Sequence, residues 1–252
     1  MEGIKRLLEK NPGLLDVSPL DPERKGRRLR YEKALKCDRV EEIAREFVNL
    51  ASRLPNWKID SFSVEKIFNF GKNIAMDFNI DLPEIERLFN KILNKYIRGG
   101  LLGFFISGLC RKVIKEKEVL KVDLTKYPAS VSGLGYRHKC GRIEITGNKT
   151  YYVGVEMEGG EIVVRGSVGN YLGKSMKGGQ IIIDGDARNW VGDKMEDGLI
   201  LIKGNTGHVI GKGMTGGEIV IHGNVGHWVG EGAQGGTIRV KGLLQFCQDN
   251  LL

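Results

Sequence analysis

A 19-residue period dominates the second half of this 252-residue chain. From residue 140 to residue 242 the sequence divides into consecutive copies with no insertion between them, and each copy carries two glycines and a pair of apolar residues. The first glycine recurs at positions 147, 166, 185, 204, 223 and 242, and the second at 154, 173, 192, 211 and 230. Isoleucine occupies positions 143, 162, 181, 200, 219 and 238, and Ile or Val follows two residues later in every copy.

Residues two apart lie on the same face of a β-strand, so each copy contains a short strand with one apolar face. One such strand cannot bury that face alone, but stacked copies bury all of the faces together. The period therefore predicts a β-helix over residues 140–252, with neighbouring turns about 4.8 Å apart. The tail Leu243–Leu252 is expected to cover the open end of the stack.

Gly211, Gly213 and Gly216 match the G-x-G-x-x-G pattern of a dinucleotide-binding loop. That pattern binds a pyrophosphate only when a helix follows it, because the helix N-terminus holds the phosphates. Here the strand-like segment EIVIHG follows, and the same glycine spacing returns 19 residues later. The glycines are therefore interpreted as corners of the repeat. With no nucleophile elbow or metal cluster either, the sequence predicts no catalytic residue and no cofactor.

The repeat resembles the G-x-G-x-G repeat domain, through segments such as GGEIVVRG at 159–166 and VGNYLGKSM at 168–176. That domain forms the C-terminal right-handed β-helix of the glutamate synthase large subunit, and it recurs as a separate subunit of formylmethanofuran dehydrogenase. The resemblance covers residues 140–242 only. It implies a right-handed β-helix that serves as a scaffold within an oxidoreductase complex and takes no part in the chemistry.

The first half of the chain has the apolar spacing of helices, so the fold class is expected to be α+β in two domains. Helices are predicted at residues 3–10, 31–36, 39–53, 63–76, 81–98 and 105–117, with a strand at 119–124. The predicted organisation is a mainly helical domain over 1–125, a linker over 126–139 and a β-helix with its C-terminal cap over 140–252.

The net charge of +8 lies in the first half, where residues 1–139 hold 28 Lys and Arg against 19 Asp and Glu. The basic run Arg24–Arg30 could attract nucleic acid, but no nucleic-acid-binding motif accompanies it. The four cysteines lie far apart, which favours free thiols in a reducing cytoplasm. The longest apolar run, residues 100–110, is too short and too rich in glycine to span a membrane.

One column of the repeat is polar and contains two histidines one period apart. It consists of Tyr151, Asn170, Asn189, His208 and His227. His208 and His227 would lie on adjacent turns, within reach of one metal ion, and are therefore weak candidate ligands. A stacked hydrogen-bonding ladder of Asn170, Asn189, His208 and His227 is the favoured interpretation, because the sequence indicates no third ligand.

Two further columns bear on function. A mostly aromatic column consists of Tyr152, Tyr171, Trp190, Val209 and Trp228, and periodicity does not determine whether it faces inward or outward. Alternation along the strands places Val163, Ile182, Leu201 and Val220 on the outside of four successive turns. This apolar stripe, roughly 14 Å long, is expected to be covered by the helices of residues 38–117 or by another subunit.

Two hypotheses follow from these features. The first is a non-catalytic structural subunit that organises partner enzymes, either as part of a larger complex or as a homo-oligomer. The alternative is a self-sufficient ligand-binding or catalytic protein with its site between the helical domain and the β-helix. The absence of a recognisable nucleophile, metal cluster or cofactor loop in the sequence favours the first.

Overall fold

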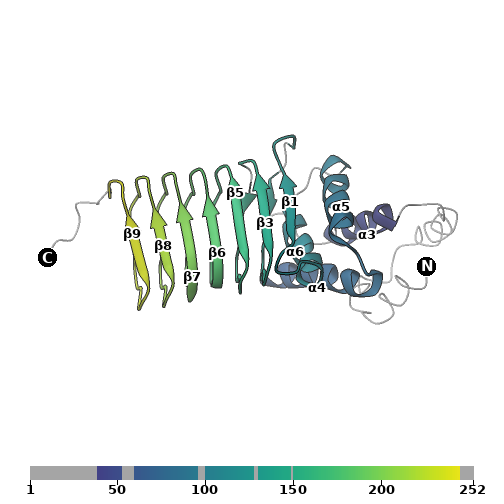
Figure 1. Cartoon of the computed structure of the whole chain (residues 1–252), viewed down its shortest axis with the longest axis horizontal. Coiled ribbons are helices and arrows are strands. Elements are labelled where there is room, and N and C mark those ends of the chain that lie inside the picture. Colours follow the sequence, from purple (N-terminus) through teal and green to yellow (C-terminus); the bar gives the residue numbers. More distant parts are fainter. Residues whose placement is uncertain (1–38, 53–59, 96–99, 128–129, 149, 245–252) are drawn as a thin grey trace.

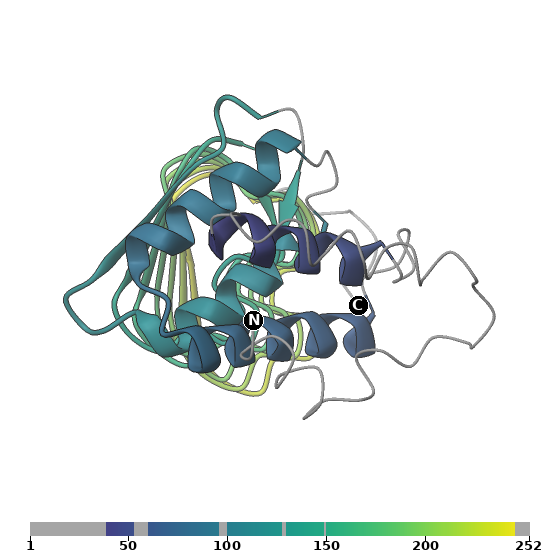
Figure 2. The same ribbon diagram turned by 90° about the vertical axis from the view of Figure 1, so that its right-hand side faces the viewer.

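The computed structural model describes residues 39–52, 60–95, 100–127, 130–148 and 150–244. It consists of a group of helices at one end of a long solenoid of parallel strands (Figure 1). Viewed along the solenoid, the helices lie across its first turn (Figure 2). The short helices expected at 3–10 and 31–36, the basic run Arg24–Arg30 and most of the tail, residues 245–252, lie outside the described residues.

The described part of the first half forms four helices, and side chains cap the N-termini of two of them. They are α3 (Arg39–Ala51), α4 (Ser61–Phe78), α5 (Leu82–Lys95) and α6 (Leu102–Val113). The carboxylate of Asp60 accepts a hydrogen bond from the Ser63 amide at 2.8 Å, so α4 begins two residues before the predicted start. At α5, the amide of Glu84 donates to Asp81 and the amide of Asp81 donates to Glu84, which is a capping box.

Helix α6 spans 102–113, whereas the sequence predicted 105–117. Its apolar residues continue toward its N-terminus, so that Leu102 and Phe104 are buried. At the other end Ile114 is extended, and the Lys115 amide donates to the Glu118 carboxylate instead of to a helical carbonyl. The acidic and basic residues after 113 therefore form the turn that leads into the first strand.

Helices α4 and α6 pack at very short range through a pair of glycines. A Cβ added at Gly71 would overlap the backbone oxygen of Phe105, and one added at Gly108 would overlap the backbone oxygen of Phe68. The Phe105 ring stacks against Phe47 of α3, with ring centroids 4.6 Å apart. The two glycines therefore set the distance between the helices, and the phenylalanines fill the space around them.

The solenoid is built from a seven-stranded parallel sheet and shorter lines of bridge pairs. The strands of the sheet, in spatial order, are β1 (Val119–Asp123), β3 (Arg142–Thr146), β5 (Glu161–Arg165), β6 (Lys177–Ile183), β7 (Asp197–Ile202), β8 (Glu218–Ile221) and β9 (Thr237–Val240). From β3 onward each strand pairs with the next at the 19-residue offset, as in the pair Ile143 and Ile162. The described part of the second half is therefore a β-solenoid of about six turns, as the period predicted.

The core of the solenoid consists of the isoleucine column and its neighbours. Ile162, Ile181, Ile200 and Ile219 are fully buried, and Met157, Met176, Met195 and Met214 form a second buried column beside them. At the last described turn Ile238 is only partly buried, and Leu243 and Leu244 are exposed. The predicted cover over this end falls mainly on residues outside the described range.

The segment 126–139, expected to be a linker, contributes to the first turn of the solenoid. Strand β1 pairs in parallel with β3 at a 23-residue offset, and β2 (Val131–Ser132) pairs in parallel with β4 (Thr150–Tyr151). Leu134, Tyr136 and His138 are buried. The solenoid therefore begins near residue 119. Strand β2 keeps the 19-residue offset to β4, whereas β1 lies 23 residues before its partner in β3.

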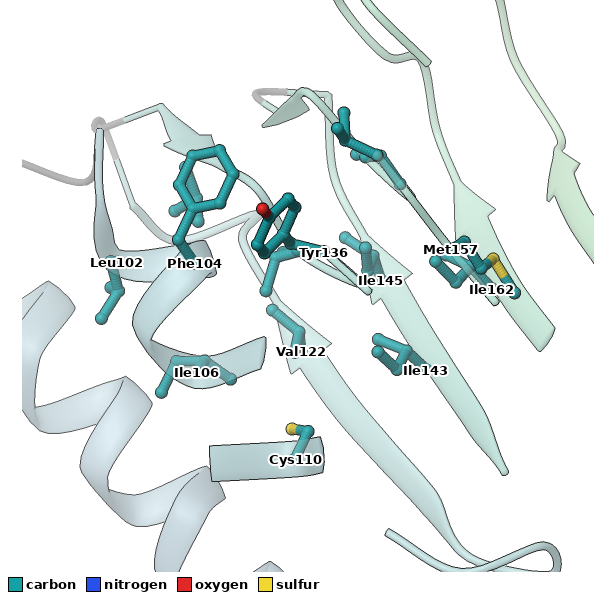
Figure 3. Close-up of a cluster of buried hydrophobic side chains, with 14 of the residues drawn as sticks. Leu102, Phe104, Ile106, Cys110, Val122, Tyr136, Ile143, Ile145, Met157 and Ile162 are labelled. Atoms are coloured by element: carbon teal, nitrogen blue, oxygen red, sulfur yellow. The ribbon is translucent and has the colours of Figure 1, made fainter. Parts of the chain in front are cut away.

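Helix α6 packs directly on this first turn. A Cβ added at Gly103 would overlap the backbone oxygen of Ser132, and the Ser107 hydroxyl accepts hydrogen bonds from the amides of Gly135 and Tyr136 at 2.9 and 3.2 Å. Figure 3 shows Phe104 and Ile106 of α6 beside the inward residues of the first turns. Helices and solenoid share one continuous apolar core.

Candidate functional site

The glycines that match a dinucleotide-binding pattern are corners of the solenoid. Gly211 and Gly213 have φ values of 65° and 61°, in the left-handed region that glycine adopts most easily. The next regular element is strand β8, not a helix. Without a helix N-terminus this segment lacks the group that would bind a pyrophosphate.

The polar column is a series of side chain to backbone hydrogen bonds between turns. The Asn170 carbonyl oxygen accepts from the Asn189 amide at 3.1 Å, and the Asn189 oxygen accepts from the His208 amide at 2.8 Å. The Nδ1 atom of His208 accepts from the His227 amide at 3.0 Å, and the two imidazoles stack with centroids 5.1 Å apart. Each side chain thus satisfies a backbone donor of the next turn.

The bond to Nδ1 of His208 occupies one of the two nitrogens through which this residue could bind a metal ion. Because Nδ1 accepts a hydrogen bond from an amide, it carries no proton itself, and the proton of the neutral ring lies on Nε2. Within the ranges that the structure describes, no three His, Cys, Asp or Glu side chains are grouped so that they could hold a metal ion. His208 and His227 are therefore better explained as members of the column than as ligands.

A second column of the same kind was not predicted from the sequence. The amides of Ser167, Asp186, Asn205, Asn224 and Leu243 each donate to the side chain 19 residues earlier, at 2.7–3.0 Å. The acceptors are Asn148, Ser167, Asp186, Asn205 and Asn224. The signal was present, because residues with short polar side chains recur there at the repeat period.

The aromatic column lies at a corner of the solenoid. Tyr152, Tyr171 and Trp190 stack on one another with centroids 4.9 and 5.8 Å apart, and all three have left-handed backbone conformations. The rings are partly exposed, and Trp228, on the other side of Val209, is 61% exposed. Because the first three rings cover one another's faces, they offer mainly their edges to solvent and make a poor stacking platform for a ligand.

The apolar stripe lies on the outer face of the sheet. Val163, Ile182, Leu201 and Val220 are register partners on β5, β6, β7 and β8. Val163 is 7% exposed, and the other three are partly exposed. Ion pairs flank the stripe, including Lys203 with Asp184 at 2.7 Å and Arg239 with Glu218 at 2.9 Å.

The described helices do not cover this stripe, contrary to one of the two expectations for it. The strands that they contact most are β1 and β2, at the start of the solenoid. In Figure 1 they gather at the β1 end of the solenoid, away from β6, β7 and β8. The physical reason is that the first turn needs a cover for the end of the apolar core, and α6 provides it.

A polar pocket lies where α4 and α6 meet the first turns, in the region named by the alternative hypothesis. It has a volume of about 330 Å³, at the small end of the range for ligand pockets. The residues that line it are Glu65, Phe68, Asn69, Lys72, Arg111, Arg137, Glu156, Glu158 and Lys177. None of them was among the site residues predicted from the sequence.

Two arginines hold the three carboxylates of the pocket. Arg111 binds Glu158 through its two terminal nitrogens, Nη1 and Nη2, at 2.9 and 3.0 Å, and also donates to the backbone oxygen of Arg137. Arg137 binds Glu156 at 2.8 Å and Glu65 at 2.9 Å. Since Glu65 and Arg111 belong to helices, these bonds join the helices to the solenoid.

The electrostatic effects in the pocket follow from this pairing. The hydrogen bonds from Arg111 lower the pKa of Glu158. Burial opposes the charge on Arg137, but its bonds to Glu156 and Glu65 outweigh that effect and raise the pKa of the guanidinium. Burial, and then the charge of Glu156, raises the pKa of Tyr136. The carboxylate of Glu158 and the guanidinium of Arg137 are therefore charged, and Tyr136 is neutral, near pH 7.

No helix in the described ranges is long and apolar enough to cross a membrane. No protein-family model and no curated protein matches the chain.

Proposed function

We propose that this chain is a non-catalytic structural subunit that organises partner enzyme subunits, with the outer face of the solenoid as the binding surface. The observation that carries the proposal is the apolar stripe of Val163, Ile182, Leu201 and Val220. Its residues lie in register on four strands, and Ile182, Leu201 and Val220 are partly exposed. Contiguous apolar surface of this kind usually marks a contact.

The recurrent polar residues of the solenoid also favour a structural role. Asn189, His208 and their counterparts accept hydrogen bonds from the backbone of the next turn. Side chains used in this way stabilise the coil and hold neighbouring turns in register. The result is a rigid face, which a partner can bind with little loss of conformational entropy.

The resemblance to the G-x-G-x-G repeat domain supports a particular class of partner, namely redox or amidotransferase enzymes of the glutamate synthase or formylmethanofuran dehydrogenase kind. It also supports a right-handed coil, as does the strong preference of parallel strand connections for that hand. Cys110 and Cys140 are free thiols, which suits a reducing compartment such as the cytoplasm.

The test is the double substitution Ile182→Asp with Leu201→Asp in protein purified from its native cell. Both side chains point away from the core, so circular dichroism should show an intact fold. Size-exclusion chromatography should show loss of the partner subunits, or of the homo-oligomer if the stripe joins two copies. Two buried charges at the centre of an interface should weaken assembly by roughly a hundredfold or more.

The matched control is Thr215→Asp with Gln234→Asp, which adds the same charge at exposed positions outside the stripe. This variant should assemble as the unmodified protein does. If the stripe variant also assembled normally, the stripe would not be the interface. If it unfolded, the inward and outward faces would have been assigned wrongly.

The pocket between the helices and the solenoid favours a second function, the binding of a small ligand. It is concave and polar and lies between two structural units, where ligand sites are common. Its charge pattern indicates which class of ligand it fits.

A further inference from the structure

Lys72 and Lys177 differ from the other charged residues of the pocket. Arg111 and Arg137 already hold the carboxylates of Glu65, Glu156 and Glu158. By contrast, among the described residues the structure gives neither lysine an ion-pair partner. Four cations and three anions line the pocket, so it holds an excess of positive charge.

The two lysines enter the pocket from different structural units. Lys72 is partly buried on α4, and Lys177 is exposed at the start of β6. An anion between them would be attracted by both ammonium groups, and more strongly by Lys72, which is partly buried. The amide of Asn69, on the same helix as Lys72, adds a polar group to the lining.

We propose that this pocket binds a phosphate dianion, either free or as the charged group of a small phosphate ester, with Lys72 and Lys177 as its main contacts. The planar forks of both arginines are occupied by carboxylates, which leaves two ammonium groups as point charges. Ammonium groups suit a compact dianion, whereas planar carboxylates are matched best by a free guanidinium. The small volume suits a small phosphate compound better than a dinucleotide.

Binding has a structural consequence, because the pocket spans the junction between α4 and the solenoid. A ligand that contacts both Lys72 and Lys177 stabilises the docked arrangement over any state in which the helices separate from the first turns. The pocket is distinct from the apolar stripe. Phosphate binding is therefore independent of the proposed scaffold function.

The experiment measures the thermal unfolding of the full chain and titrates binding by calorimetry, with inorganic phosphate and with glycerol 3-phosphate. Sodium chloride at equal ionic strength is the reference, because it reproduces the screening of surface charge without a specific dianion. Phosphate should raise the melting temperature above the chloride value. A tighter Kd for glycerol 3-phosphate identifies an ester as the ligand, and equal or weaker binding identifies the free anion.

The variant Lys72→Met with Lys177→Met should bind phosphate at least tenfold more weakly. The control, Lys112→Met with Lys194→Met, removes the same charge at exposed positions that do not line the pocket. It should bind phosphate as the unmodified chain does. The proposal is overturned if phosphate stabilises no more than chloride, or if both double variants lose affinity equally, since either result means that only overall charge matters.

Discussion

The repeated turns and the helix-covered first turn bury their residues by different kinds of contact. In the repeated turns a residue meets its own counterpart, as Ile181 pairs with Ile162 and Ile200, and Asn189 binds the backbone of His208 in the same column. At the helical end the partners are unlike and distant in sequence, as in Glu65 with Arg137 or Gly71 with Phe105.

This difference determines how each region tolerates change. A repeated turn depends on its two neighbours, so its stability is approximately a sum of contacts between adjacent turns. The helical end depends on a few individual contacts that no second copy reproduces. Substitutions in the repeat should therefore have effects graded by position along the stack, whereas substitutions at the helical end should have effects specific to one residue.

The largest expected effect is that of Ile181→Ala in the middle of the stack. Ile181 is fully buried, so truncation removes apolar contacts and leaves a cavity, at a cost of about 2–5 kcal/mol in the free energy of unfolding. The same change at Ile238, which is only partly buried, should cost less than about 1 kcal/mol, because solvent already reaches that turn. Urea unfolding of both variants measures the difference. Equal losses would show that the last turn is as well covered as the middle ones.

A smaller loss is expected for Gly71→Ala at the contact between α4 and α6. Alanine favours a helix over glycine by about 1 kcal/mol, but its Cβ would overlap the Phe105 backbone, and such overpacking costs typically 1–3 kcal/mol. The net change should be destabilising. Gly100→Ala is the control, since nothing lies within 4 Å of a Cβ there. Thermal unfolding that showed Gly71→Ala to be as stable as the control would mean that the helices can move apart without loss.

The same contrast explains how much of the fold could be predicted from the sequence. The solenoid was predicted from its period, because the core contacts between its turns repeat a residue type at a fixed spacing, as with Ile162, Ile181 and Ile200. The first turn was taken for a linker, because β1 lies 23 residues before β3 and the burial of the turn depends on α6, although β2 keeps the 19-residue offset to β4. The helices were recognised from their apolar spacing and caps, but their packing through Gly71 and Gly108 leaves no periodic signal.

The candidate sites follow the same rule. The hydrogen bonds of Asn170, Asn189 and His208 agree with an interpretation that rested on a repeated column. The pocket could not be predicted, because it combines residues from α4, α6 and three turns of the solenoid whose proximity depends on the whole fold. Lys72 and Lys177, which line it, stand out by no pattern in the sequence.

The smallest expected effect concerns pH and separates the first turn from the rest of the solenoid. His138 is 5% exposed, and burial lowers its pKa below the ordinary value of 6.5, although the hydrogen bond between Nε2 and the Gly141 oxygen, 3.2 Å long, opposes this effect. Below pH 6.5 the unfolded chain binds a proton at this residue that the folded chain does not. Its contribution should therefore reduce stability as the pH falls from 6.5 toward the lower folded pKa, by at most about 1.4 kcal/mol per pH unit.

Urea unfolding at pH 7.5 and pH 5.5 should show a smaller pH dependence in His138→Gln than in the unmodified chain. The matched control is His222→Gln, because His222 is exposed, and it should leave the dependence unchanged. Equal pH dependence in all three proteins would show that His138 takes up its proton in the folded state as readily as in the unfolded state, so that the first turn does not exclude the charged imidazole.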